Sequence, residues 1–142
     1  MVKEDSDYFV KYLLTPERNI SALNFALEAQ TKSAQVNFDL SDIDSVYKKV
    51  LEEYIEMQEA YNDRGRNFDH FKEELWDCFF ALINLCRWSG LNPEELLRAN
   101  VKKYLKRCEF IENALLVDKK NWTETNKEDI KKLWKQAKVS WL

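Results

Sequence analysis

The chain contains only two glycines and two prolines in 142 residues, and this scarcity restricts the folds that it can form. All-β folds need many turns, and alternating β/α folds need glycine-rich loops between their elements. Because the sequence has too few turn-forming residues for either class, it predicts an all-α protein. With 45% hydrophobic and 33% charged residues, we expect one folded domain with a single core.

Charge and cysteine usage narrow the functional classes. The net charge is −3, and acidic and basic residues are mixed along the chain, unlike the one-sided basic surface of a duplex-binding protein. We therefore expect no nucleic-acid partner. The three cysteines have no CxxC spacing, and two of them, Cys78 and Cys86, lie in an apolar stretch, as is typical of reduced thiols in a cytoplasmic protein. His70 is the only histidine, which argues against a structural zinc site.

We expect neither a signal peptide at the N-terminus nor a membrane span. The N-terminal residues do not resemble a signal peptide, and no apolar run approaches the roughly 18 residues of a membrane-spanning helix, so we expect no membrane association. We expect residues 1–142 to form a single domain with three parts. These are an N-terminal arm (1–14), a helical core (15–115), and a connector with a closing helix (116–142).

Capping residues and periodicity predict the helices. Thr15 and Pro16 open a first helix that runs to about residue 36, and Ser41 caps a second that runs to about Tyr61. Gly90 ends the third helix by taking a left-handed conformation after it. The remaining predicted ranges are about 68–88 for the third helix, 93–115 for the fourth and 127–138 for the last. Short connections favour an antiparallel bundle of about four main helices plus a short C-terminal helix.

Acidic residues interrupt the apolar stripe of the second helix. At helical spacing one face carries Val46, Val50, Glu53, Met57 and Ala60. Glu56 lies about 5–6 Å from Glu53 at Cβ, because residues three apart are neighbours on a helix surface. The pattern therefore places two carboxylates on, or at the border of, a face that should be buried.

The third helix repeats this arrangement. Its apolar stripe carries Phe71, Glu74, Cys78, Ala81 and Leu85. Asp77 follows Glu74 by three residues, so it borders the same face. Two acidic pairs thus lie on helices that should pack against each other in antiparallel orientation.

Four converging carboxylates need compensation, because desolvating each ion costs several kcal/mol. The two stripes contain no lysine or arginine, so a divalent cation is the remaining candidate, and Mg²⁺ suits carboxylate, water and phosphate oxygens. A solvated acidic face is the ordinary alternative, with Lys48, Lys49 and Lys72 available to pair with some of the acids. A di-iron bundle is excluded, because it needs a Glu-x-x-His motif on two helices.

The whole pattern resembles a known family. The segments "KKVLEEYIEMQEA", "EELWDCFFALINLCRWSGLNPEELLRAN" and "KYLKRCEFIE" are similar to those of MazG-type nucleoside triphosphate pyrophosphohydrolases, members of the all-α NTP pyrophosphatase superfamily. The resemblance extends over about residues 20 to 138. It implies hydrolysis of an NTP or dNTP between the α and β phosphates, giving a monophosphate and pyrophosphate. The implied cofactor is Mg²⁺, with Mn²⁺ as a substitute.

The resemblance also assigns roles to individual residues. The implied metal ligands are Glu53, Glu56, Glu74 and Asp77. Glu52 joins Glu53 as a catalytic acid that polarises the attacking water or holds a ligand in place. The implied substrate-binding residues are Gln30, Lys32, Asn84, Arg87, Lys103 and Arg107. Asn84 is supported independently, because an amide on an apolar helix face needs a hydrogen-bonding partner.

Three departures from the family pattern concern the pocket. Trp76 stands where the family usually has glycine, and Leu40 stands where it often has an aromatic residue that borders the base. Relative to the usual family pattern, this chain has one extra residue between Asn100 and Lys103. These differences leave several specialised substrates open, namely dUTP, dCTP and phosphoribosyl-nucleotides.

Two rival functions and an assembly remain as hypotheses. The chain could be a non-catalytic helical module that binds metal or nucleotide, or a purely structural bundle whose acids repel one another. The family resemblance implies a homodimer at least, or a dimer of dimers. The apolar N-terminal arm supports an oligomer independently, because a small monomer gains little by exposing it. The arm residues are Tyr8, Phe9, Val10, Tyr12, Leu13 and Leu14.

Overall fold

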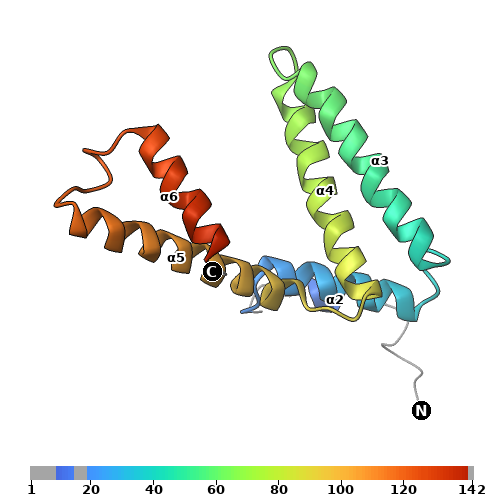
Figure 1. Cartoon of the computed structure of the whole chain (residues 1–142). Coiled ribbons are helices and arrows are strands. Elements are labelled where there is room, and N and C mark those ends of the chain that lie inside the picture. The colour runs from blue at the N-terminus through green and yellow to red at the C-terminus, as the bar shows by residue number, and fades with distance from the viewer. Residues whose placement is uncertain (1–8, 15–18, 141–142) are drawn as a thin grey trace. The chain divides into compact units, whose positions relative to one another are not determined.

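The computed structural model describes residues 9–14 and 19–140, and within these ranges all regular secondary structure is helical. The helices are α1 Val10–Leu13, α2 Ala22–Gln35, α3 Ile43–Asn62, α4 Phe68–Trp88, α5 Pro93–Val117 and α6 Lys127–Val139 (Figure 1). The prediction of an all-α protein with a short last helix is confirmed. The chain divides into two compact units, one up to Glu94 and the other from Glu95 onward.

Side-chain caps set where the helices begin. Ser21 has an extended backbone and accepts a hydrogen bond from the amide of Asn24, so α2 begins at residue 22 and the predicted earlier start is wrong. The predicted cap Thr15 lies outside the described residues. Asp42, rather than Ser41, caps α3 by accepting from the Ser45 amide at 2.7 Å. A carboxylate is as good a cap as a hydroxyl, so neighbouring Ser and Asp residues compete for the position.

The predicted end of α4 is confirmed. Ser89 is the C-cap residue, and its amide bonds to the Leu85 and Cys86 carbonyls. Gly90 follows with a φ of 68°, a left-handed conformation that costs glycine little. This turn lets the chain leave α4 sharply before α5 begins at Pro93.

Helices α3 and α4 form an antiparallel hairpin (Figure 1). The interior of this hairpin contains the most buried positions of both predicted stripes, among them Val46, Ala60 and Ala81. Glu53 shares this interior with a relative exposure of only 7%, as its place in the stripe predicts. Aromatic contacts close the far end, where the rings of Tyr61 and Phe71 lie 5.6 Å apart.

Helix α2 packs against the C-terminal half of α4 (Figure 1). The buried Gln30 side chain donates a hydrogen bond from Nε2 to the Phe80 carbonyl at 2.8 Å. At the start of α2, Ser21 donates to Glu94 at 2.7 Å. The first contact holds α2 along the part of α4 that lies beyond the acidic residues, and the second joins the start of α2 to the first turn of α5.

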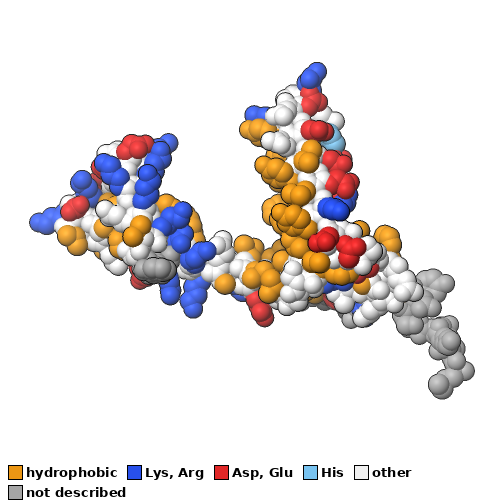
Figure 2. All heavy atoms as spheres, turned by 45° about the vertical axis from the view of Figure 1, so that its right-hand side comes forward, with side chains coloured by type: hydrophobic (Ala, Val, Ile, Leu, Met, Phe, Trp, Pro, Cys, Tyr) orange, Lys and Arg blue, Asp and Glu red, His pale blue; other side chains and the backbone are white. Residues whose placement is uncertain are grey.

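One side of the α3–α4 hairpin is apolar and exposed. We call this surface the apolar face; each of its large side chains is more than one-third exposed. Its residues are Tyr47, Leu51, Tyr54, Tyr61, Phe68, Leu75, Phe79 and Leu82. Figure 2 shows hydrophobic side chains gathered along one edge of the hairpin, and acidic side chains along the other.

The second unit is built from most of α5 together with α6. Its buried side chains are Ile111, Leu115 and Ala137. The rings of Tyr104 and Trp134 lie 5.6 Å apart, so aromatic packing joins the two helices. No helix in the described part of the chain combines the length and apolarity that a membrane crossing requires.

Candidate metal and nucleotide site

The acidic residues of the hairpin converge as their helical spacing predicts. One carboxylate oxygen each from Glu53, Glu56 and Glu74 lies within 4.8 Å of the others. We call these three residues the acidic triad. Glu53 is buried, Glu74 is half-buried and Glu56 is exposed, so the triad extends from the helix interface to the surface.

The triad fits a divalent cation with oxygen ligands. Two oxygens bound to one Mg²⁺ are at most about 4.2 Å apart, because each Mg–O distance is about 2.1 Å. The observed spread of up to 4.8 Å needs only small side-chain movements to meet this limit. The open side at Glu56 leaves room for water and phosphate oxygens, which Mg²⁺ normally keeps among its ligands.

Lys49, which is not part of either apolar stripe, compensates part of the negative charge of the acids. Lys49 Nζ lies 2.5 Å from a Glu53 oxygen and 3.0 Å from a Glu52 oxygen. The hydrogen bonds to Glu53 and then to Glu52 raise the pKa of Lys49, so it stays protonated. The alternative in which Lys49 pairs with some of the acids is therefore realised at Glu53 and Glu52, because Lys49, four residues before Glu53, reaches it from the border of the stripe.

The pKa of Glu56 records the crowding of negative charge. Desolvation raises this pKa, and the charges of neighbouring acids, Glu53 first among them, raise it further. Lys49 opposes the shift without cancelling it. The neighbouring negative charges therefore make Glu56 easier to protonate than an isolated glutamate.

Asp77 lies near the triad but is not one of its members. It is exposed, and its oxygens are not among those gathered within 4.8 Å. Burial raises the pKa of the Cys78 thiol, and the negative charges of all four predicted metal ligands, Asp77 included, raise it further. Asp77 thus contributes to the same electrostatic field from one turn further along α4.

Two other polar residues border the triad. Glu52 is exposed and faces Lys49. It also lines a shallow surface hollow on α3 together with Glu56 and Glu59. His70 lies at the surface with Nδ1 3.4 Å from a Glu74 oxygen.

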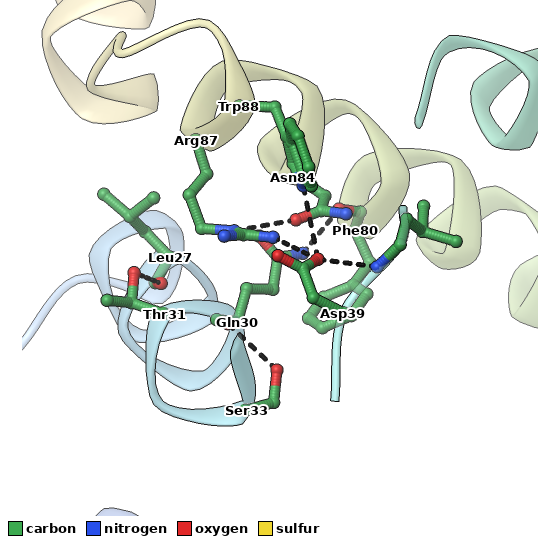
Figure 3. Close-up of polar contacts among 10 residues, drawn as sticks. Leu27, Gln30, Thr31, Ser33, Asp39, Phe80, Asn84, Arg87 and Trp88 are labelled. Atoms are coloured by element: carbon green, nitrogen blue, oxygen red, sulfur yellow. Dashed lines mark hydrogen bonds and ion pairs between the residues drawn. The ribbon is translucent and has the colours of Figure 1, made fainter. Parts of the chain in front are cut away.

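The structure brings three predicted substrate-binding residues together where α2 meets α4 (Figure 3). Arg87 donates from Nε to Asn84 Oδ1 at 2.9 Å, which gives the Asn84 amide the partner that its position requires. Gln30 lies beside them through its bond to the Phe80 carbonyl, one turn before Asn84. Gln30 Oε1 is buried and accepts no hydrogen bond from the residues that the structure describes.

Asp39 joins this group and was not predicted from the sequence. Its Oδ1 accepts from Arg87 Nη2 at 2.5 Å, from Trp88 Nε1 at 3.2 Å and from the Leu40 amide at 2.8 Å (Figure 3). Partial burial would raise the pKa of Asp39, but these hydrogen bonds outweigh it and lower the pKa. The only sequence signal was its place in the "NFDL" segment, where the resemblance drew attention to Leu40 instead.

The other predicted substrate-binding residues are described within their own units. Lys32 is half-buried in the last turn of α2. Lys103 and Arg107 belong to the second unit, where Lys103 is exposed and the Arg107 guanidinium lies 5.5 Å from the Trp134 ring centroid. Their contact with substrate stays a prediction.

The fold and the site together define a class of protein, namely an all-helical protein whose helical hairpin carries an acidic triad. No protein-family model matches the chain. It is 32% identical over 119 residues to "Nucleoside triphosphate pyrophosphohydrolase/pyrophosphatase MazG" of Thermotoga maritima, covering 84% of this chain and 45% of that protein. It is 28% identical over 125 residues to the nucleoside triphosphate pyrophosphohydrolase of Escherichia coli K12, covering 85% and 46%.

A third relative matches a shorter region. It is the uncharacterized protein YabN of Bacillus subtilis, 33% identical over 69 residues, which cover 49% of this chain and 14% of that protein. The chain is therefore related to MazG-type nucleoside triphosphate pyrophosphohydrolases, and the resemblance predicted from its motifs is confirmed. It spans about half the length of the MazG and pyrophosphohydrolase relatives that it matches.

Proposed function

We propose that this chain hydrolyses nucleoside triphosphates, ribose or deoxyribose, to a monophosphate and pyrophosphate in a Mg²⁺-dependent reaction. The observation that carries the proposal is the convergence of Glu53, Glu56 and Glu74 at the acidic motifs that match those of MazG-type enzymes. The relatives' names support the same activity. Three free cysteines fit a reducing compartment, so we place the reaction in the cytoplasm.

Each acid has a proposed task. When bound, Mg²⁺ would neutralise phosphate charge and activate a water molecule as nucleophile. Glu53, Glu56 and Glu74 would hold the ion, and Asp77 would act as its fourth ligand from the next turn of α4. Glu52, at the surface beside Lys49, would accept the proton of the attacking water. A water nucleophile needs no Ser–His or Cys–His pair.

The test is a product assay on the purified protein. A panel of NTPs and dNTPs is incubated with and without Mg²⁺, and the products are identified by phosphorus NMR. We expect monophosphate plus pyrophosphate only with metal, with turnover abolished in Glu53→Gln and Asp77→Asn. Glu73→Gln is the matched control, because Glu73 is an exposed acid of α4 outside the triad. Release of orthophosphate, or no turnover by folded protein, would contradict the proposal.

Thermal unfolding separates this function from its rivals. We expect Mg²⁺ to raise the melting temperature of the wild type through binding to the native state, and not that of Glu53→Gln. A purely structural bundle would show no Mg²⁺ response, and Glu53→Gln would stabilise it. A non-catalytic module would bind Mg²⁺ and nucleotide without turnover.

We further propose that the chain forms a homodimer through the apolar face of the α3–α4 hairpin. Soluble monomers seldom expose a continuous apolar surface of this extent. The exposed fractions of Phe79 and Tyr54, 58% and 52%, support an interface here. The N-terminal arm, whose Leu13 is buried while Val10 and Leu14 are exposed, adds apolar surface; Tyr8 lies outside the described residues, and so does the side chain of Tyr12.

A further inference from the structure

The polar group around Arg87 lies away from the acidic triad along the same helix. Arg87 follows Glu74 by thirteen residues, so the two positions are separated by about 20 Å along the α4 axis. Phe80, whose carbonyl holds Gln30, lies about 9 Å along the axis from Glu74. A triphosphate chain bound at the triad is too short to cover the full distance, so a nucleotide that contacts both groups must place its nucleoside, and not its phosphates, at Gln30 and Arg87.

Asp39 and Asn84 fix the Arg87 guanidinium at two of its nitrogens. Nη2 donates to Asp39 and Nε donates to Asn84, so the plane of the guanidinium is set. Among the described residues, none accepts a hydrogen bond from Nη1. Arg87 therefore presents one oriented nitrogen to a ligand while its charge is balanced by Asp39.

The orientation of the Gln30 amide is also determined. A carbonyl can only accept, so the group facing the Phe80 carbonyl must be the amide nitrogen, at 2.8 Å. The amide oxygen then points the other way, and it is a buried acceptor without a partner on a side chain only 6% exposed. A buried acceptor of this kind is costly unless a donor reaches it, and a ligand N–H would supply one.

We propose that Asp39 is a positioning residue that holds Arg87 beside Gln30, so that the two together recognise a base edge with a carbonyl next to a ring N–H. Arg87 donates to the carbonyl, and Gln30 Oε1 accepts from the N–H. Uracil, thymine, guanine and hypoxanthine carry this edge, whereas cytosine and adenine present an amino group beside an unprotonated nitrogen. The inference rests on the proposed function, and it assigns Arg87 to recognition of the base rather than of the phosphates.

The sharpest test compares uridine and cytidine nucleotides, which differ only at this edge. We would measure the affinities of α,β-methylene-UTP, α,β-methylene-CTP and inorganic triphosphate by calorimetry with Mg²⁺ present. The α,β-methylene group blocks the bond that the proposed reaction cleaves. We expect the wild type to prefer the uridine analogue by about tenfold or more, since the wrong edge leaves buried polar groups unpaired.

Variants then test the role of Asp39. Asp39→Ala and Arg87→Ala should each reduce the preference to nearly one, and the double variant should be no worse than Arg87→Ala, because Asp39 acts through Arg87. Arg87→Lys should not restore the preference, since lysine cannot be held at two nitrogens. Affinity for inorganic triphosphate should not change in any variant. Asp69→Ala is the matched control, because Asp69 is exposed and forms an ion pair with the exposed Lys72.

The outcomes distinguish this inference from the proposed function. Wild-type preference for the cytidine analogue, additive effects in the double variant, or loss of inorganic triphosphate binding would overturn the inference. Continued hydrolysis of UTP to UMP and pyrophosphate in that case would leave the proposed function standing. If the wild type binds neither nucleotide, both fail. An unchanged Mg²⁺ effect on melting temperature in Asp39→Ala shows that the triad is intact, and a change in the Trp88 indole N–H chemical shift on this substitution shows that the Asp39 contact is gone.

Discussion

Lys49 Nζ lies 2.5 Å from a carboxylate oxygen of Glu53, the most buried acid of the triad. The pair joins positions i and i+4 of one helix, so it forms within α3 without help from the rest of the chain. The site therefore contains a positive charge of its own before any metal binds. A divalent ion that binds Glu53 must displace this ammonium group or share the carboxylate with it.

Lys49→Met should lower the metal-free free energy of unfolding by about 1–2 kcal/mol. This is less than the roughly 3–5 kcal/mol of a fully buried pair, because the Lys49 side chain is 42% exposed. Saturating Mg²⁺ should recover most of the loss, since the ion takes over the neutralisation of Glu53. Urea unfolding with and without Mg²⁺ measures both effects. Lys72→Met removes an exposed ion pair with Asp69 and serves as control; an equal loss with and without Mg²⁺ in Lys49→Met would contradict the prediction.

Glu56→Gln should stabilise the metal-free protein at neutral pH. The pKa of Glu56 is raised above 4.5, so the folded state binds its proton more tightly than the unfolded state does. Ionisation of Glu56 therefore costs stability as the pH rises through the raised pKa, and the variant avoids that cost. The gain should shrink as the pH falls toward 4.5, where both states are increasingly protonated. Melting temperatures from pH 4 to 8 in a chelator test this, and a gain that does not depend on pH would contradict it.

Phe79→Glu should dissociate the proposed dimer. The side chain is 58% exposed at the centre of the apolar face, and a charge there would be desolvated on association. Light scattering should give about twice the 17.0 kDa chain mass for the wild type and one chain mass for the variant. Leu116→Glu, at an exposed apolar position of α5, should leave the mass unchanged. A wild type of 17.0 kDa in dilute solution would exclude the dimer.

Gly90→Ala should lower the free energy of unfolding by about 1 kcal/mol through backbone strain alone. Gly90 has a φ of 68°, and nothing lies within 4 Å of a Cβ built there, so the new methyl group meets no clash. Gly65 has equally open surroundings and no positive φ, and Gly65→Ala should be neutral or slightly stabilising. Chemical denaturation of both variants makes the comparison; an equal effect at the two sites would contradict the strain argument.

Features with local causes were predicted well. The scarcity of glycine predicted the all-helical fold. The presence of glycine at position 90 predicted the left-handed turn that ends α4. Helical spacing placed Glu53 in the interior and Glu56 and Glu74 beside it, because positions on one helix and on its antiparallel neighbour are fixed by a short connection. The alternation of apolar and acidic positions thus carried most of the information about the triad.

Features that depend on long-range contacts or side-chain reach were missed. Asp39 and Arg87 are 48 residues apart, and their pairing depends on how the connection after α2 lies on α4. Lys49 was named from the sequence as a lysine available to pair with the acids, but its particular partner, Glu53, was not predicted, because the pairing depends on the reach of a flexible side chain from beside the stripe. Asp42 competes with Ser41 for the same cap, a choice that differs by only a fraction of a kcal/mol.

Helix α4 carries Glu74 near its beginning and Asn84 and Arg87 near its end. Because one helix positions both groups, it constrains how the sequence can diverge. On the proposed assignment, substitutions in the last turns would change the base that is read while the proposed metal ligands keep their positions. An insertion or deletion of one residue between them would instead rotate one group by about 100° relative to the other. Divergence of substrate preference on this scaffold is therefore expected to proceed by point substitution, with the length of α4 between the two groups held constant.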